Sequence, residues 1–188
     1  MINSIKNAQN DMRTGYGYGS VGVFTSGLVW LASALAVDRY GSNTGMWTLI
    51  IGGMMIFPLS TLIGKLVGVT GKHDKSNPLA KAAMEGTVWM IMCIPLAYGV
   101  SMVQPEWFFQ SMLLIIGGRY LTFASLYGLR MYWILGCLLG LAAYILFALQ
   151  ADAFISALAG GVIELVFGIM LYVYFKKRAV TDFSETAG

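Results

Sequence analysis

Residues 106–128 read EWFFQSMLLIIGGRYLTFASLYG, and after Glu106 the run contains one charged side chain, Arg119. A helix that crosses a bilayer needs about 20 predominantly apolar residues, and this run has that length. Strands of a membrane barrel alternate apolar and polar residues with a period of two. The centre of the run, Met112 to Ile116, lacks this alternation, so the run predicts a transmembrane helix and not a barrel strand.

Five further runs have the same apolar character, and together with the first they predict six transmembrane helices. They cover residues 20–37, 45–64, 79–103, 129–149 and 152–175. Six spans use roughly 120 residues, so a chain of 188 has no room for a separate soluble domain. The composition agrees, since 57 % of the residues are hydrophobic, 11 % are charged and the mean hydropathy is +0.70.

We therefore expect an all-α integral membrane protein with one transmembrane domain over residues 1–188 and short tails at 1–19 and 176–188. This class excludes a soluble enzyme and a nucleic-acid-binding module, because both have about a quarter of their residues charged. The expected partners are the lipid bilayer and an unknown small solute or ion. A homo-oligomeric assembly is left open by the sequence.

Lysine and arginine residues gather at alternate ends of the predicted helices, and this asymmetry predicts the orientation of the chain. One side carries Lys6, Arg13, Lys65, Lys72, Lys75, Lys81, Arg130, Lys176, Lys177 and Arg178, and the other carries Arg39 alone. Because cytoplasmic segments are rich in these residues, we expect both termini in the cytoplasm and the helices in the cytoplasmic (inner) membrane. The turns near 38–44, 104–105 and 150–151 are then external.

An internal repeat is one interpretation of the spacing of tryptophan and glycine. Each odd-numbered span contains a tryptophan and each even-numbered span contains a double glycine: Trp30, Trp89 and Trp133, and Gly52-Gly53, Gly117-Gly118 and Gly160-Gly161. The pattern is typical of three tandem helical hairpins. The restricted composition of membrane segments is the competing explanation, in which paired glycines only let two backbones approach.

Two opposite charges lie at similar depth in the predicted membrane. Arg119 is 13 residues past Glu106 and Glu164 is 12 past Asp152, which places them ~20 and ~18 Å along helices that run in the same direction. Glu164 shares a helix face with Gly160 and Gly168, so it should point towards protein. An ionisable group at this depth needs a partner or water, and we expect Arg119 and Glu164 to meet.

Glu85 is a third charged candidate, about two turns inside its span, and Lys81, Arg13 and Arg130 are its alternative partners. Two interpretations of these charges remain open. In the first, Arg119, Glu164 and Glu85 line a pathway for a small solute or ion, and Tyr120 and Tyr127 supply hydroxyl groups. In the second, an interhelical salt bridge only fixes the packing of helices.

Other reactive chemistry is sparse in this sequence. His73 is the only histidine and lies in the loop Lys72-His73-Asp74-Lys75. A zinc site needs further histidine or cysteine ligands, and a Ser-His-Asp triad needs a histidine beside the serine. We therefore expect no enzyme activity, no metal and no cofactor.

Three segments carry a resemblance to a known family: Asn77-Pro78-Leu79, PEWFF at 105–109 and LIIGGRYLT at 114–122. With them the chain resembles a family of small uncharacterised bacterial membrane proteins with six helices, which implies a fold but no activity. The third hairpin is more loosely similar to acid-resistance membrane proteins, through Gly136, Gly140, Gly161, Glu164 and Gly168. That similarity implies a role under stress without naming a ligand.

The first hypothesis for function is thus a small-solute or ion permease or channel with a polar site at mid-membrane. The alternative is a structural or stress-response membrane protein that transports nothing, in which the buried charge pair only fixes the packing of helices.

Overall fold

The structure, a computed structural model, describes residues 4–186 of the chain, with side chains up to Arg178. The described residues form helices and no strand. The elements are α1 (Ile5–Tyr16), the 3-10 turn η1 (Gly17–Gly19), α2 (Ser20–Tyr40), α3 (Ser42–Val67), α4 (Pro78–Ser101), α5 (Trp107–Tyr127), α6 (Met131–Ala148) and α7 (Ala153–Thr186).

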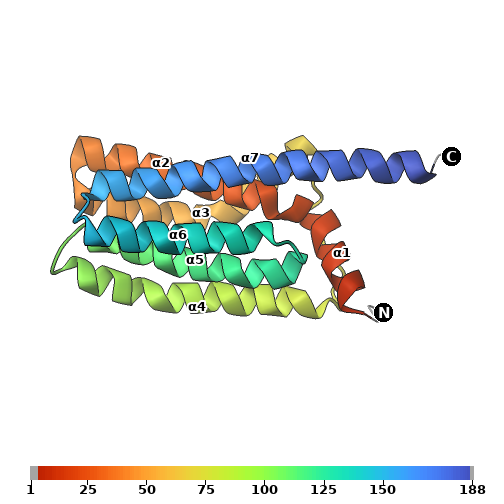
Figure 1. Cartoon of the computed structure of the whole chain (residues 1–188), viewed down its shortest axis with the longest axis horizontal. Helices are drawn as coiled ribbons and strands as arrows, with labels where there is room; N and C mark the ends of the chain where they lie inside the picture. The colour runs from red at the N-terminus through yellow and green to blue at the C-terminus, as the bar shows by residue number, and fades with distance from the viewer. Residues whose placement is uncertain (1–3, 187–188) are drawn as a thin grey trace.

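Six long helices, α2 to α7, lie side by side in one bundle (Figure 1). Five helical segments are long and apolar enough to cross a membrane, and α5 is not among them. The reason lies in its composition, since α5 carries polar side chains such as Gln110 and Arg119 among its apolar residues. The structure therefore supports a helical membrane protein, and the six-span count stays a prediction.

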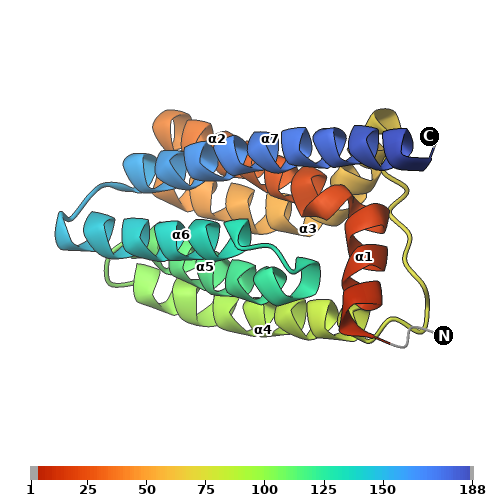
Figure 2. The same ribbon diagram turned by 45° about the vertical axis from the view of Figure 1, so that its right-hand side comes forward.

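Helix pairing differs from three equivalent hairpins. The most extensive contacts join α2 to α7, α2 to α3 and α5 to α6, whereas α6 and α7 touch little although they are consecutive. The three tryptophans of the supposed repeat also differ, because Trp30 is fully buried while Trp89 and Trp133 are about half exposed. The three hairpins are therefore not equivalent in their packing, and the repeat itself stays a prediction. The last helix lies back against α2 and so closes the bundle (Figure 2).

Glycines hold the central helices close together, as the packing interpretation of the paired glycines predicts. A Cβ atom added at Gly117 of α5 would lie 2.8 Å from the carbonyl oxygen of Gly136 on α6, and one at Gly136 would lie 2.7 Å from the carbonyl oxygen of Gly117. In contrast, α3 and α4 lie at the periphery, since only 11 % and 6 % of their apolar segments are buried. Their apolar side chains are available to contact lipid.

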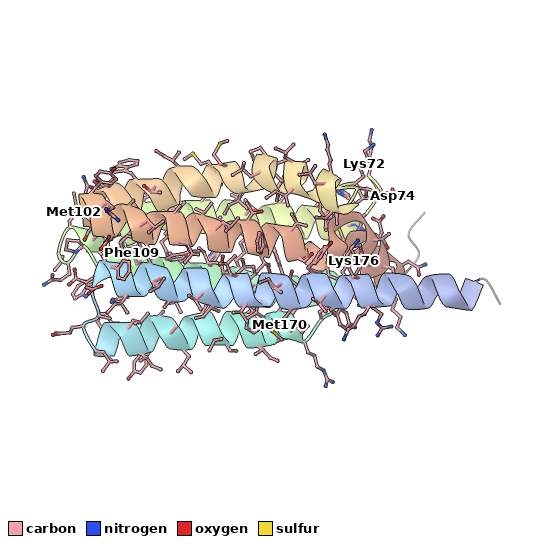
Figure 3. All side chains as sticks on the ribbon, turned by 90° about the horizontal axis from the view of Figure 1, so that it is seen from above. Lys72, Asp74, Met102, Phe109, Met170 and Lys176 are labelled. Atoms are coloured by element: carbon pink, nitrogen blue, oxygen red, sulfur yellow. The ribbon has the colours of Figure 1, made fainter. Side chains whose placement is uncertain are left out.

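One end of the bundle, called the basic end here, carries Lys72, Asp74 and Lys176, and the opposite end carries Met102 and Phe109 (Figure 3). The beginning of α1 and the end of α7 both lie at the basic end (Figure 1). At this end Asn77 caps α4 by accepting a hydrogen bond from the Leu79 amide, with Pro78 as the first helical residue. This start is the one that the Asn-Pro pair favours.

The two expected tails are instead largely helical. Residues 5–16 form α1, which lies across the basic end (Figure 2) and packs against α4 and α5. Residues 176–186 continue α7 beyond the bundle (Figure 1). The sequence misses α1 because its residues are polar, and its stability comes from contacts with the bundle and not from an apolar face in lipid.

Candidate functional site

Glu164 is the twelfth residue of α7, near the middle of the apolar part of that helix, and has no exposed surface. The two glycines on its helix face bring α7 against α2. A Cβ atom at Gly160 would lie 2.8 Å from the indole of Trp30, and one at Gly168 would lie 2.7 Å from the backbone of Phe24. The carboxylate is thus enclosed by protein on the side that the spacing of Gly160, Glu164 and Gly168 indicates.

Three polar side chains face the Glu164 carboxylate: Ser26 and Trp30 of α2 and Tyr120 of α5. We call these four residues the Glu164 cluster. Its members lie close enough for hydrogen bonds to the carboxylate, but among the described residues neither oxygen of Glu164 accepts one with good distance and angle. The indole N–H of Trp30 is also buried without a partner there. Because almost all buried polar groups in proteins are paired, such a cluster requires a specific explanation.

Arg119 lies beside the cluster in sequence but points to the other side of α5. Its guanidinium donates to the hydroxyl of Thr87 at 3.0 Å and contacts the sulfur of Met90 at 3.6 Å, both on α4. It also lies 5.1 Å from the ring centre of Phe123, at a distance typical of a cation–π interaction. Arg119 therefore holds α4 against α5.

The expected pairing of Arg119 with Glu164 is wrong. Within residues 4–178 the structure has one ion pair, between Asp38 and Arg39 at 3.4 Å. The reason is the geometry of the α-helix, in which the side chains of successive residues point about 100° apart. Tyr120 faces α7, so Arg119 must face α4, and depth along the helix alone does not specify this direction.

Glu85 also lies away from the cluster. It is exposed on the outer face of α4, beside Lys81, Met84, Val88, Trp89 and Met92 of the same helix. In the described part of the chain it forms no ion pair with Lys81, Arg13 or Arg130. The structure therefore does not bring Glu85 together with Arg119 or Glu164.

Tyr120 and Tyr127 are both buried and are joined by a third tyrosine that the sequence analysis missed. The ring of Tyr132, on α6, stacks on Tyr120 at 6.0 Å and on Tyr127 at 5.4 Å between ring centres. Its hydroxyl donates to the carbonyl oxygen of Tyr18 at 2.7 Å. Ser26 and Trp30 were also missed, although their spacing of four residues places them on one face of α2.

A family model matches residues 5–174 of the chain, which include α1, the Glu164 cluster and the three stacked tyrosines. The chain belongs to a family of unknown function (DUF7010). No curated protein and no solved structure matches it. The family description is consistent with the resemblance to an uncharacterised family, and it gives no support to the similarity with bacterial acid-resistance proteins.

The Glu164 cluster suits the exchange of a proton or another small ligand at a carboxylate. Ser26 and Tyr120 carry hydroxyl groups that can donate or accept a hydrogen bond, and the Trp30 indole can only donate. The described residues contain no group of three or more His, Cys, Asp and Glu side chains that could hold a metal ion. The site thus consists of a single acid surrounded by three donors.

Proposed function

We propose that the protein is an integral membrane permease for an ion or small solute and that Glu164 is the group that binds it. One observation carries the proposal: a carboxylate without exposed surface or hydrogen-bond partner among the described residues lies midway along a bundle of apolar helices. An ionisable residue at this position in a membrane protein is by default a functional site.

The energetics of the carboxylate support this proposal. A buried charge is disfavoured unless it is fully paired, and the three neutral donors around Glu164 carry no opposite charge. Uptake of a proton, a cation or a polar solute would therefore stabilise the group when the bundle is closed. Release of that ligand requires a conformation in which water reaches the carboxylate. Binding and release are therefore linked to opening and closing of the bundle, as transport requires.

The alternative, a charge pair that only fixes helix packing, loses its main support. That interpretation needs Arg119 and Glu164 to neutralise each other, but Arg119 binds Thr87 and Met90 on α4 instead. An unpaired buried carboxylate lowers stability. We therefore favour a function in binding over a function in packing.

The proposed orientation has the basic end in the cytoplasm and the helices in a cytoplasmic (inner) membrane. Lys72 and Lys176 lie at this end in Figure 3, and membrane proteins concentrate lysine and arginine on the cytoplasmic side. The only arginine expected on the other side, Arg39, is partly neutralised by its ion pair with Asp38. Both termini would then be cytoplasmic.

Flux through reconstituted vesicles tests the proposed function. The purified protein is placed in liposomes that contain pH-, potassium- and chloride-sensitive dyes in separate preparations, and the decay of each imposed gradient is recorded. The wild type should speed the decay of at least one gradient, and Glu164→Gln should reduce that rate at least tenfold. Glu85→Gln is the matched control, because Glu85 lies on the outer face of α4, and it should leave the rate within twofold.

Two results would contradict the proposal. One is an unchanged rate for Glu164→Gln in protein that remains folded by circular dichroism and gel filtration. The other is a wild-type protein that accelerates none of the gradients above the leak of empty vesicles.

A further inference from the structure

A column of tyrosine side chains runs from the Glu164 cluster towards the basic end. Tyr120, which faces Glu164, and Tyr127 are seven residues apart on α5, a distance of ~10 Å along the helix. Tyr132 lies between them and stacks on both rings. These three residues, which we call the tyrosine column, place hydroxyl-bearing side chains between the buried carboxylate and the end of the bundle.

The backbone of η1 closes the outer end of the tyrosine column. Tyr132 donates its hydroxyl hydrogen to the carbonyl oxygen of Tyr18. A Cβ atom at Gly19 would overlap the Tyr132 hydroxyl and would lie 3.0 Å from the ring of Tyr127. The absence of a side chain at Gly19 is therefore what lets the main chain lie directly on the column.

Helix α1 is fastened over this closure by polar contacts. Gln9 donates to the carbonyl oxygen of Ser125 at 2.7 Å, and Arg13 donates to the carbonyl oxygens of Tyr127 and Gly128. On its other side, Asp11 accepts a hydrogen bond from the Asn77 amide at 2.7 Å. These contacts are polar and partly exposed, so water can replace them when α1 moves away. The same movement would expose Ala8 and Met12, the two apolar side chains of α1 that are buried in the bundle.

The connection between α1 and α2 has the geometry of a hinge. Gly17, Tyr18 and Gly19 have φ values of 54°, 58° and 75°, so three successive residues adopt the left-handed conformation. Tyr18 is not a glycine, and this conformation is strained for it. A short non-helical segment between two helices is the kind of place where closure of a lid is absorbed.

We infer that the ion bound at Glu164 is a proton, that it reaches Glu164 from the basic end along the tyrosine column, and that α1 closes this route by turning about residues 17–19. This inference rests on the proposed function. In the open state a hydronium ion in the entering water gives its proton to the nearest hydroxyl and becomes water. Each hydroxyl on the way accepts one proton and passes one on, and the carboxylate of Glu164 takes up the last proton and becomes neutral. Release reverses these steps.

The donors around Glu164 favour a proton over a metal cation. A hard cation needs about six oxygen ligands, whereas the cluster offers one carboxylate and two hydroxyls. The Trp30 indole presents a hydrogen towards the carboxylate and cannot act as a ligand. Arg119 is the charged side chain that acts on Glu164 from a neighbouring element, and its positive charge also opposes a second cation.

Reversible cross-linking of α1 to α5 tests the route. Gln9→Cys and Ser125→Cys are introduced after Cys93→Ala and Cys137→Ala, and a short bis-methanethiosulfonate reagent joins them. Proton flux into pyranine-loaded liposomes should fall at least tenfold after cross-linking and should recover after reduction. Each single-cysteine variant treated with the same reagent is the control and should keep its flux.

Accessibility gives a readout that does not depend on transport. Tyr127→Cys, in the background without other cysteines, should react slowly with a membrane-impermeant maleimide. Arg13→Ala, which removes the contacts of α1 with Tyr127 and Gly128, should speed that reaction at least tenfold. Tyr132→Phe keeps the stacked ring and removes the hydroxyl, so proton flux should fall at least fivefold, whereas Tyr144→Phe on the exposed side of α6 should have no effect.

The outcomes separate this inference from the proposed function. Two results would overturn the inference and leave the proposed permease in place. One is Glu164-dependent flux of another ion without any proton flux, and the other is proton flux that cross-linking leaves unchanged. Flux that Glu164→Gln leaves unchanged would overturn both. An equal maleimide reaction rate with and without Arg13→Ala would show that α1 does not cover the route.

Discussion

Replacement of Glu164 by methionine should make the protein more stable and inactive at the same time. Methionine has a similar length, no branch at Cβ and no group that needs a hydrogen bond, so it can occupy the space between α2, α5 and α7. In the wild type, a buried carboxylate lacks a hydrogen-bond partner among the described residues. Leaving a buried polar group unpaired costs about 1–3 kcal/mol.

We therefore expect Glu164→Met to raise the free energy of unfolding by about 2 kcal/mol. Unfolding by sodium dodecyl sulfate in mixed micelles, followed by circular dichroism, measures this change. Glu106→Met is the control: it lies in the turn before α5, away from the cluster, and should change stability by less than about 0.5 kcal/mol. Transport by Glu164→Met should fall to the level of Glu164→Gln.

A loss of stability in Glu164→Met would refute the reasoning. If the free energy of unfolding fell by more than about 1 kcal/mol, the carboxylate would have a stabilising partner. The argument for a binding role would then fail as well, because it depends on a Glu164 carboxylate without a partner.

Three further predictions concern the surroundings of the site. Arg119→Met removes a charged hydrogen bond and a cation–π contact between α4 and α5, so the free energy of unfolding in micelles should fall by about 2 kcal/mol. Gly117→Ala places a methyl group against the backbone of Gly136 and should lower the melting temperature, at a cost of about 1–3 kcal/mol. Hydrogen bonds from the backbone and hydroxyl of Ser76 hold the pKa of Asp74 below its usual value. Asp74 therefore contributes stability at pH values above its usual pKa, and this contribution is lost as the pH falls through the lowered pKa. Ser76→Ala removes the hydroxyl and should move this loss to higher pH. Hydrogen exchange of residues 68–77, measured as a function of pH, checks the shift.

The long helices and the burial of Glu164 could be predicted from the sequence because they depend on local patterns. Apolar runs of membrane length predict helices, and the Asn77-Pro78 pair predicts where α4 begins. Glycines four residues before and after Glu164 predict that it faces another helix. Each of these inferences uses residues that lie within one helix.

Features that depend on which helices are neighbours could not be predicted in the same way. The depth of Arg119 follows from a rise of about 1.5 Å per residue, but its direction depends on where α4 lies around α5. The return of α7 to α2 likewise depends on contacts between distant segments, which no local pattern specifies. Helix α1 escaped detection because it is held by hydrogen bonds to carbonyl oxygens at the end of α5, and its own side chains carry little apolar signal.

Helix α7 has 34 residues, a length of ~51 Å, whereas the hydrocarbon core of a bilayer is about 30 Å thick. In the proposed membrane orientation about 20 Å of this helix would stand outside the lipid, continuous with the segment that carries Glu164. A rotation of about 10° about Glu164 would displace the end of α7, ~33 Å further along the helix, by roughly 6 Å. The length of α7 therefore converts a small rotation of the membrane segment into a larger displacement at its end. A spectroscopic label at that end would report this displacement from outside the bilayer.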